Sequence, residues 1–455
     1  MIKKEIYNNV QSLENLLSEI CDTLWNNPEL GGFEKESANL FRKLLEKEGF
    51  RIVNEAKLEH AFYAEYGKGK PVIAVLGEYD ALPQLSQEIS TEKKAVREGA
   101  PGHGCGHNLL GTATAIGAIA VKKFLEANNI EGTIRFYGCP EEELLSGKVK
   151  MIYHNMFEGC DAAITWHPMS SNMVYDKAFL ANTSLKFYFK RVTAHAAFAP
   201  ERGRSSLDAV ELMNIGINYL REHVIDKTKI HYAVDTGNFP PTIVPDTSSS
   251  WYFVRAPHMK NVKDTMERIK KIAQGAALMT ETEMEFKLDC GCYEFKKNTT
   301  FANLAHANLI EAEKPEYTLE EEEFSKKLQE TLNKELLEKE KKVFGNNSGM
   351  STGVCNRNLW ESYELNGSSD SGDVSQIIPS CLYTTACWPV VVSPLTWQAT
   401  ASTGSSLGKK GALYSAMVCA GIAFDLFTQP ELLNKIKKEF DDEKDGDEYM
   451  PLYNG

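Results

Sequence analysis

A glycine-rich segment of the chain, residues 102–108 (GHGCGHN), carries side chains that could bind a metal ion. Cys105 and His107 are separated by a single glycine, so in an extended loop both side chains project the same way. Thiolate and imidazole are preferred ligands of zinc, cobalt and related metals. A helix predicted from Asn108 would place its positive end nearby and favour the thiolate. The alternative is a glycine turn around a buried cysteine.

Two acidic segments follow predicted strands. Glu78 and Asp80 come directly after the apolar residues 71–76, and residues 138–143 (GCPEEE) end in a run of glutamates. Adjacent carboxylates repel one another unless a cation lies among them. One of them can then bind metal while its neighbour takes a proton from water. The alternatives are turn carboxylates in the first segment and a solvated helix start in the second.

A histidine at the end of another predicted strand completes the set. His167 precedes a proline, which holds it in an extended conformation. A lone histidine is usually structural, but ligands of open α/β sheets collect at the carboxyl ends of the strands. Together the segments favour a metal-dependent site. No G-x-S-x-G elbow lies between a strand and a helix, and H-E-x-x-H is absent. Cys290 and Cys292 are interpreted as structural.

The elements that must position these residues alternate in the first third of the chain. Strands separated by helices predict an α/β fold, a mostly parallel sheet with helices on both faces. The predicted strands cover 71–76, 133–137 and 162–166, and the predicted helices cover 11–48 and 108–127.

From about residue 183 the pattern changes to the order β-α-β-β-α-β, which predicts an inserted α+β domain of the ferredoxin-like kind. Its predicted strands cover 184–190, 229–235, 249–255 and 283–288, and its helices 205–222 and 260–278. We therefore expect a main domain formed by residues 1–182 and 298–455, with an inserted domain at 183–297. The Glu- and Lys-rich residues 311–342 predict exposed helices.

Composition limits the class of protein. The 455 residues are 42% hydrophobic and 25% charged, which is typical of a globular protein with two or three folding units. The net charge of -13 argues against nucleic-acid binding, which needs clustered cations. We expect no membrane span, because no apolar run approaches about 18 residues, and no secretory signal. Ten scattered cysteines favour reduced thiols and a cytoplasmic location.

Several motifs in a fixed order identify a family resemblance. Over residues 10–430 the chain resembles the amidohydrolase branch of the metallo-aminoacylase and carboxypeptidase superfamily. The motifs are GEYDALP at 77–83, HGCGHN at 103–108, PEEE followed by SGK at 140–148, WHP at 166–168, AHAAFAPERGR at 194–204 and SDSGDVS at 369–375.

The resemblance implies a catalytic domain with a two-metal site and a smaller lid domain that also forms a homodimer. The implied metal ligands are Cys105, His107, Glu143 and His167. One or two divalent ions could be bound. Zinc, manganese and cobalt all remain open, since cysteine favours softer ions while carboxylates tolerate manganese.

The resemblance also assigns catalytic and substrate-binding roles. Glu142 takes the position of the general base, and Asp80 that of the acid supporting a neighbouring ligand. His195 lies in the lid, where the equivalent histidine of such dimers reaches the partner's site and stabilises the oxyanion. Arg255 is a candidate anchor for a substrate carboxylate. Thr242 stands in a segment where relatives tend to carry Asn, so contacts with substrate there are expected to differ.

The implied reaction is hydrolysis of the amide bond of N-acyl or N-aroyl amino acids, of the aminobenzoyl-glutamate kind, or of dipeptide-like compounds with a free carboxylate. One departure matters. Relatives carry a further His ligand before a Thr-Trp-Gln run, but residues 393–398 read SPLTWQ and no histidine follows His306. Two alternatives therefore stay open: a catalytically impaired homologue that acts as a binding or regulatory subunit, and a mononuclear enzyme of unrelated substrate class.

Overall fold

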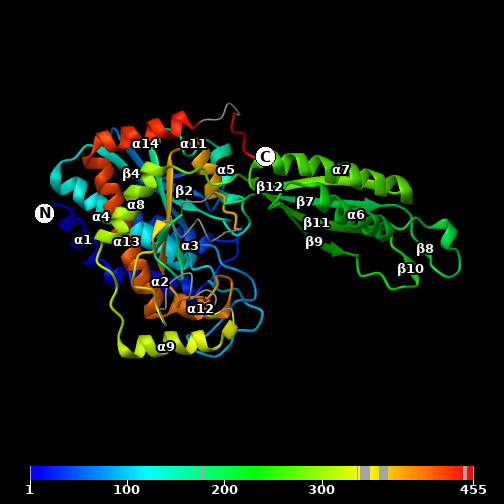
Figure 1. Ribbon diagram of the computed structural model, residues 1–455, viewed down its shortest axis with the longest axis horizontal. Coiled ribbons are helices and arrows are strands. Elements are labelled where there is room, and N and C mark those ends of the chain that lie inside the picture. Colours follow the sequence, from blue (N-terminus) through cyan, green and yellow to red (C-terminus); the bar gives the residue numbers. More distant parts are fainter. Residues whose placement is uncertain are drawn as a thin grey trace. The chain divides into compact units, whose positions relative to one another are not determined.

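The computed structural model describes residues 2–175, 179–335, 337–338, 349–357, 367–443 and 448–453. The chain divides into two compact units (Figure 1). The first unit comprises Met1–Lys177, Lys296–Leu365 and Val374–Tyr449, and the second comprises Ala178–Phe295, Asn366–Asp373 and Met450–Gly455.

The first unit is built on a 7-stranded mixed sheet in the order β1-β2-β4-β3-β5-β13-β6. The central strands β4, β3, β5 and β13 run parallel, whereas β1, β2 and β6 pair antiparallel at the edges. This arrangement confirms the mostly parallel sheet. The strands are β1 (Arg51–Asn54), β2 (Phe62–Lys68), β3 (Val72–Glu78), β4 (Gly132–Cys139), β5 (Ala162–Met169), β6 (Met173–Val174) and β13 (Ser380–Ala386).

Helices cover both faces of this sheet. In β3 the side chains of Ile73 and Val75 join one apolar cluster with residues of α4 and α13, while Ala74 and Leu76 join another with Met151 of α5. Successive strand residues point to opposite faces, so these clusters lie on opposite sides of the sheet. The helices are α1 (Ile2–Gln11), α2 (Glu14–Asn26), α3 (Lys35–Lys47), α4 (His107–Asn128), α5 (Gly147–Tyr153), α8 (Thr299–Glu311), α9 (Leu319–Glu330), α11 (Ser371–Ile377), α12 (Trp397–Gly404), α13 (Ser406–Thr428) and α14 (Pro430–Asp442).

Helix α13 is long and apolar enough to cross a membrane, with a mean hydropathy of 1.5 over its most apolar window. That window is 83% buried inside the protein. Among the described residues no other helix meets the same criteria. The apolar surface of α13 therefore packs in the core of the first unit.

The helical periodicity predicted at 11–48 corresponds to two helices rather than to one continuous helix. The chain forms α2 and α3 there, and α1 ends at Gln11. Pro28 follows α2 directly, and Gly32 has a φ of 86°, a left-handed backbone that favours glycine. The apolar periodicity continues across this break because both helices pack against the same core.

The second unit contains a 4-stranded antiparallel sheet in the order β12-β7-β11-β9, with a short β8–β10 pair beside it. Its chain order is β-α-β-β-α-β, which confirms the ferredoxin-like α+β prediction. Residues of α6 and α7 share one apolar cluster with inward-facing residues of β7 and β11. The elements are β7 (Ala181–Lys190), β8 (Ala194–His195), α6 (Ser206–Leu220), β9 (Lys229–Asp235), β10 (Ile243–Val244), β11 (Thr247–Ala256), α7 (Met259–Thr280) and β12 (Glu283–Cys292).

Candidate active site

The carboxyl ends of the parallel strands β3, β4 and β5 meet at one edge of the first unit's sheet and carry the candidate site. Asp80 follows β3, and Glu142 follows β4. His167 lies near the end of β5, which extends beyond the predicted strand at 162–166. His107 is the first residue of α4. These positions bring residues far apart in the sequence to one place, as expected for a parallel sheet.

His107 is fully buried and oriented by Asp80. Its Nδ1 lies 2.8 Å from Asp80 Oδ1 and donates to this carboxylate, which leaves the Nε2 lone pair free to bind a cation. Carboxylate oxygens of Glu78, Glu142 and Glu143 lie 3.4, 3.9 and 4.0 Å from Nε2. The imidazole therefore faces a group of acidic side chains.

Cys105 and His167 also lie close to this imidazole. Cys105 Sγ is 3.3 Å from His167 Nε2, and His167 Nδ1 donates to the Pro168 carbonyl at 2.7 Å. Donor atoms of Cys105, His107 and His167 all lie within 4.8 Å of one another. Gly106, with a φ of 80°, makes the turn between the first two ligands. The predicted thiolate and imidazole ligands thus converge.

The acidic loop after β4 is fixed by hydrogen bonds to its backbone. The N–H of Glu143 donates to Asp80 Oδ2 at 2.8 Å, and the N–H of Glu141 donates to Glu34 Oε1 at 2.7 Å. Asp80 therefore orients both His107 and the loop. The same contacts hold Glu142, which is buried, beside the imidazole.

The donor atoms fit a divalent cation. Within the described part of the chain, Glu78 Oε2, His107 Nε2 and Glu143 Oε1 are buried without a hydrogen-bond partner. Buried polar atoms left unpaired cost free energy, and a cation among them would remove that cost. Sulfur, nitrogen and oxygen donors together are typical of zinc and related metals.

Burial and neighbouring charges shift the pKa values of four groups at the site. Burial raises the pKa of Glu143 to about 7 and holds the pKa of the Cys105 thiol well above its usual range. Burial therefore opposes the thiolate that the positive helix end was expected to favour. Burial lowers the pKa of His167 to about 4, so this imidazole is neutral, as a metal ligand must be. Burial alone would lower the pKa of His107, but attraction to Asp80 and Cys105 raises it well above its usual value. The acidic surroundings therefore favour positive charge at His107, either a proton on the ring or a cation bound at Nε2.

The remaining predicted residues belong to the second unit. His195 is exposed in β8, and its Nδ1 accepts the N–H groups of Ala197 and Phe198. Exposed Thr242 lies on the neighbouring segment, where its carbonyl accepts the N–H of Ala196 at 2.9 Å. Arg255, in β11, donates to Ser368 Oγ at 2.8 Å. Their proposed roles stay predictions.

The segment that lacks the expected histidine lies against the ligand loop. The N–H of Leu395 donates to the Gly104 carbonyl at 2.9 Å. The side chain of Leu395 is aliphatic and cannot bind a metal ion. This segment therefore lies beside the candidate ligand loop, but Leu395 supplies no side-chain atom that could bind the ion.

A buried ion pair at the site was not among the sequence predictions. Lys148 Nζ, in α5, lies 2.7 Å from Glu78 Oε1, and the Lys148 side chain is fully buried. The position of Glu78 directly after a predicted strand already indicated that its carboxylate could belong to the site. No sequence signal connected it with Lys148.

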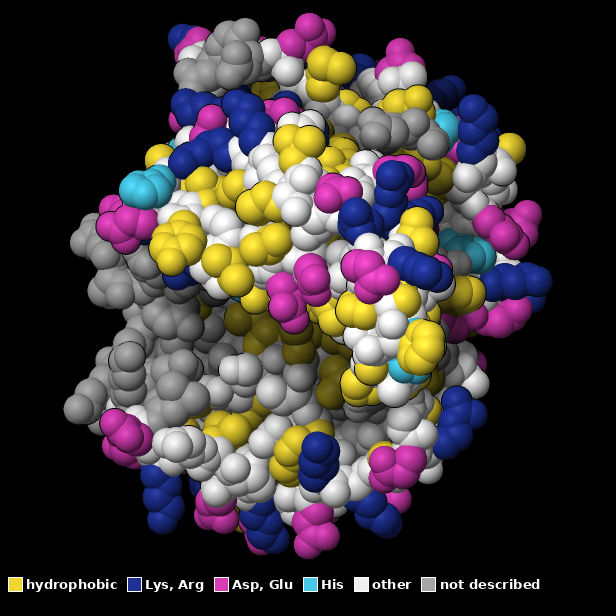
Figure 2. Space-filling model, turned by 90° about the vertical axis from the view of Figure 1, so that its right-hand side faces the viewer, with side chains coloured by type: hydrophobic (Ala, Val, Ile, Leu, Met, Phe, Trp, Pro, Cys, Tyr) yellow, Lys and Arg dark blue, Asp and Glu magenta, His cyan; other side chains and the backbone are white. Residues whose placement is uncertain are grey.

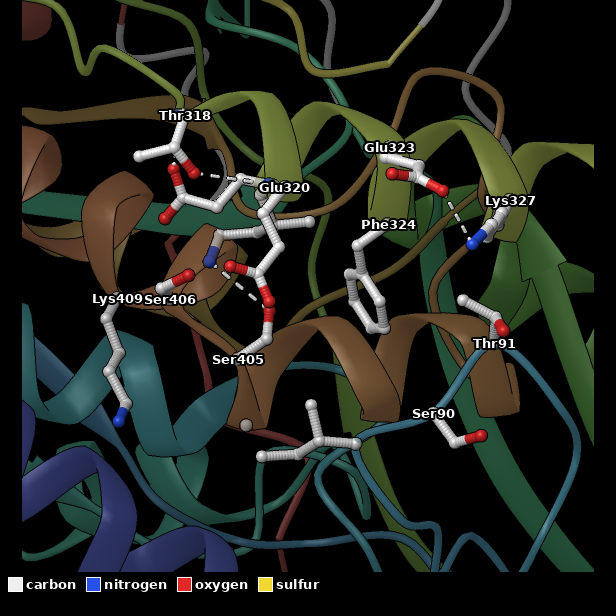
Figure 3. Close-up of a pocket in the computed structure, with 14 residues that line it drawn as sticks. Ser90, Thr91, Thr318, Glu320, Glu323, Phe324, Lys327, Ser405, Ser406 and Lys409 are labelled. Carbon is white, nitrogen blue, oxygen red and sulfur yellow. Dashed lines mark hydrogen bonds and ion pairs between the residues drawn. The ribbon is translucent and has the colours of Figure 1, made fainter.

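A separate cavity of about 880 Å³ lies elsewhere in the first unit (Figure 3). It is lined by α9, the junction of α12 with α13, and the loop at 89–91, and none of the candidate ligands lines it. The charged groups drawn in Figure 3 include the Glu323–Lys327 pair, at 2.8 Å. The cavity is therefore not part of the candidate active site.

Sequence comparison identifies relatives along most of the chain. Residues 74–354 match the model of Peptidase family M20/M25/M40. The chain is 39% identical over 438 residues to one of the subunits of p-aminobenzoyl-glutamate hydrolase from Escherichia coli (strain K12), covering 93% of this chain and 91% of the relative. It is 25% identical over 457 residues to Xaa-Arg dipeptidase of Mus musculus, covering 97% and 92%.

Solved structures share the fold. A putative aminohydrolase from methicillin-resistant Staphylococcus aureus has a TM-score of 0.66 at 15% identity, covering 93% of this chain and 99% of the other. A dinuclear metal binding peptidase of the M20 family from Bacillus subtilis has a TM-score of 0.59 at 17% identity, covering 92% and 99%. With the sequence match, these findings show that the chain belongs to peptidase family M20/M25/M40.

Proposed function

We propose that this hydrolase cleaves the amide bond of N-acyl or N-aroyl amino acids, or of dipeptide-like compounds, that carry a free carboxylate. The observation that carries the proposal is the convergence of Cys105, His107 and His167 beside buried acidic groups. The names of the relatives, one from a p-aminobenzoyl-glutamate hydrolase and one an Xaa-Arg dipeptidase, support this class of substrate.

The proposed cofactor is one or two divalent ions, zinc, manganese or cobalt, held by Cys105, His107, Glu143 and His167. A divalent ion bound there polarises the amide carbonyl and lowers the pKa of a water molecule. The unpaired His107 Nε2 and Glu143 Oε1, together with the neutral His167 ring, support this ligand set.

Glu142 is the proposed general base. Its carboxylate is held beside His107 by the loop that Asp80 and Glu34 anchor. In this role Glu142 accepts a proton from the attacking water and delivers it to the leaving nitrogen, after which the amine and the carboxylic acid separate. Asp80 keeps the His107 Nδ1 proton in place throughout.

The proposed roles in the second unit concern the substrate. Arg255 anchors the substrate carboxylate, and Thr242 contributes further contacts with the substrate. In a homodimer, His195 of one chain stabilises the oxyanion that forms in the active site of the other chain. Exposure of the His195 ring and of β9, an edge strand, supports such an assembly. Figure 2 also shows hydrophobic side chains exposed on the face it presents, but these do not identify a partner. We place the enzyme in the cytoplasm, with no nucleic-acid or membrane partner.

The alternative of an impaired binding or regulatory subunit is not favoured. The missing histidine motivates it, since Leu395 occupies the segment beside Gly104. However, Cys105, His107 and His167 keep their donor atoms together, and Glu142 is in place. These groups support hydrolysis over a role in binding alone.

Elemental analysis with a substrate screen tests the proposal. The purified chain is measured for bound metal and assayed against p-aminobenzoyl-glutamate, other N-acyl amino acids and dipeptides, before and after chelation. We expect bound divalent metal, release of an amino acid, and loss of turnover on chelation that added metal restores. Absence of both metal and turnover would favour the binding role.

A further inference from the structure

Glu78 and Lys148 form an ion pair beside His107 in the candidate active site. Both side chains are buried, with exposed fractions of 3% and 0%, and Lys148 Nζ lies 2.7 Å from Glu78 Oε1. Buried ion pairs contribute little net stability, because desolvation opposes the attraction. This pair therefore calls for a role beyond holding the fold together.

The other oxygen of Glu78 faces the metal ligands. Glu78 Oε2 lies 3.4 Å from His107 Nε2, closer than any oxygen of Glu142 or Glu143. Within the described residues neither Glu78 Oε2 nor His107 Nε2 has a hydrogen-bond partner. Donor atoms of Glu78, His107 and Glu142 also lie within 4.8 Å of one another.

We propose that Glu78 is a further protein ligand of the ion bound by His107, and that Lys148 holds Glu78 so that only Oε2 is presented. The inference rests on the proposed metal site and adds a residue to its ligand set. It explains why Glu78 Oε1 binds the Lys148 ammonium group while Glu78 Oε2 has no hydrogen-bond partner. A purely structural pair would leave no reason for a buried oxygen to face an unpaired imidazole nitrogen.

An oxygen ligand at this point also agrees with the chemistry of the site. Carboxylates bind zinc, manganese and cobalt, and a carboxylate that is itself hydrogen-bonded keeps a fixed orientation. Glu78 ends β3, so its backbone is fixed by pairing with β4. Glu142 keeps the role of the base, because Glu78 supplies the acidic ligand beside His107.

The test is titration of the metal-free full-length chain with Co²⁺, followed by its visible absorption. The variants are Glu78→Gln, which removes the charge, and Glu78→Asp, which keeps the charge but withdraws the carboxylate by one C–C bond. Asp161→Asn is the matched control, because Asp161 is another buried carboxylate that binds lysines, Lys70 and Lys437. Thermal unfolding without metal verifies that each variant is folded.

We expect Glu78→Gln and Glu78→Asp to weaken Co²⁺ binding at least about 10-fold, the smallest loss expected even for a residue that only hydrogen-bonds a ligand. The ligand-field bands should shift in both, while Asp161→Asn matches the wild type. Wild-type affinity and bands in Glu78→Asp would show that Glu78 acts at most through its charge and would overturn the inference. If Glu78→Gln does not fold, Glu78→Asp decides alone. Failure of the wild-type chain to bind Co²⁺ would instead overturn the proposed metal site.

Discussion

At the scale of single residues, the site depends on Asp80, whose two carboxylate oxygens accept hydrogen bonds from two different groups. One accepts the Nδ1 proton of His107, and the other accepts the N–H of Glu143. The carboxylate thereby fixes the imidazole tautomer and the acidic loop together. Burial raises the pKa of Asp80, but the attraction and hydrogen bond to His107 outweigh it and lower the pKa, which keeps Asp80 an acceptor at neutral pH.

The substitution Asp80→Asn should weaken metal binding about 10- to 100-fold. An amide can turn its NH₂ group toward Nδ1 or toward the Glu143 N–H, so one of the two contacts is lost. The measurement is zinc affinity by competition with a chelator. Unchanged affinity in a folded Asp80→Asn protein would show that Asp80 does not orient the ligand.

Much of the site could be predicted from residue types and spacing, because Cys105 and His107 sit close together in the sequence and Glu142 in a run of acids. The Glu78–Lys148 pair could not, because it joins distant segments through a contact that depends on packing of α5. The structure does not place His195 or Arg255 in the first unit.

At the scale of elements, the start of β3 is tied down by Asp161. Its carboxylate accepts the N–H of Val72 at 2.8 Å and binds Lys70 and Lys437 at 2.9 and 2.7 Å. Burial raises the pKa of Asp161, but the contacts with Lys437, Val72 and Lys70 outweigh it and lower the pKa below its usual value. The N-terminal end of β3 is thus stabilised by a charged residue that lies away from the candidate active site.

Asp161→Asn should lower the free energy of unfolding by about 1.5–3 kcal/mol at pH 7, the usual range for hydrogen bonds to a charged group. Because the folded pKa is depressed, this stabilisation is present above the unfolded pKa of about 3.9 and is lost as the pH falls through the folded value. Denaturant unfolding of both proteins from pH 7 to pH 3 measures the difference. A difference that does not shrink in acid would contradict the charged contacts.

The elements themselves were predictable where local signals were strong. The apolar run at 71–76 and the alternation at 184–190 match β3 and β7, because burial pattern follows strand geometry. The boundary between α2 and α3 was missed, because their shared core continues the helical periodicity across Pro28.

At the scale of the whole molecule, the chain combines a unit that carries the candidate active site with a ferredoxin-like unit. The division at 1–182, 183–297 and 298–455 stays a prediction. By internal contacts, Asn366–Asp373 and Met450–Gly455 group with the second unit although they are distant in sequence. Such returning segments depend on tertiary contacts, which local patterns do not reveal.

The proposed homodimer predicts complementation between inactive variants. His195→Ala and Glu142→Gln, each inactive alone, should recover up to about a quarter of wild-type turnover when co-expressed, because a mixed dimer has one site with both residues intact. Turnover and molecular mass by light scattering are measured on the mixture. A monomeric protein, or no recovery in a verified mixed dimer, would contradict a shared site.

The most direct test of the proposed mechanism is the turnover and metal content of Glu142→Gln, beside Glu141→Gln as the matched control. Glu141 is a neighbour in the same loop, and its carboxylate accepts from Ser146 Oγ at 2.6 Å. We expect Glu142→Gln to lose at least about 10²- to 10⁴-fold in turnover while holding as much metal as the wild type. Glu141→Gln should keep most of the wild-type turnover. Near-normal turnover in Glu142→Gln would contradict the role of Glu142 as the base.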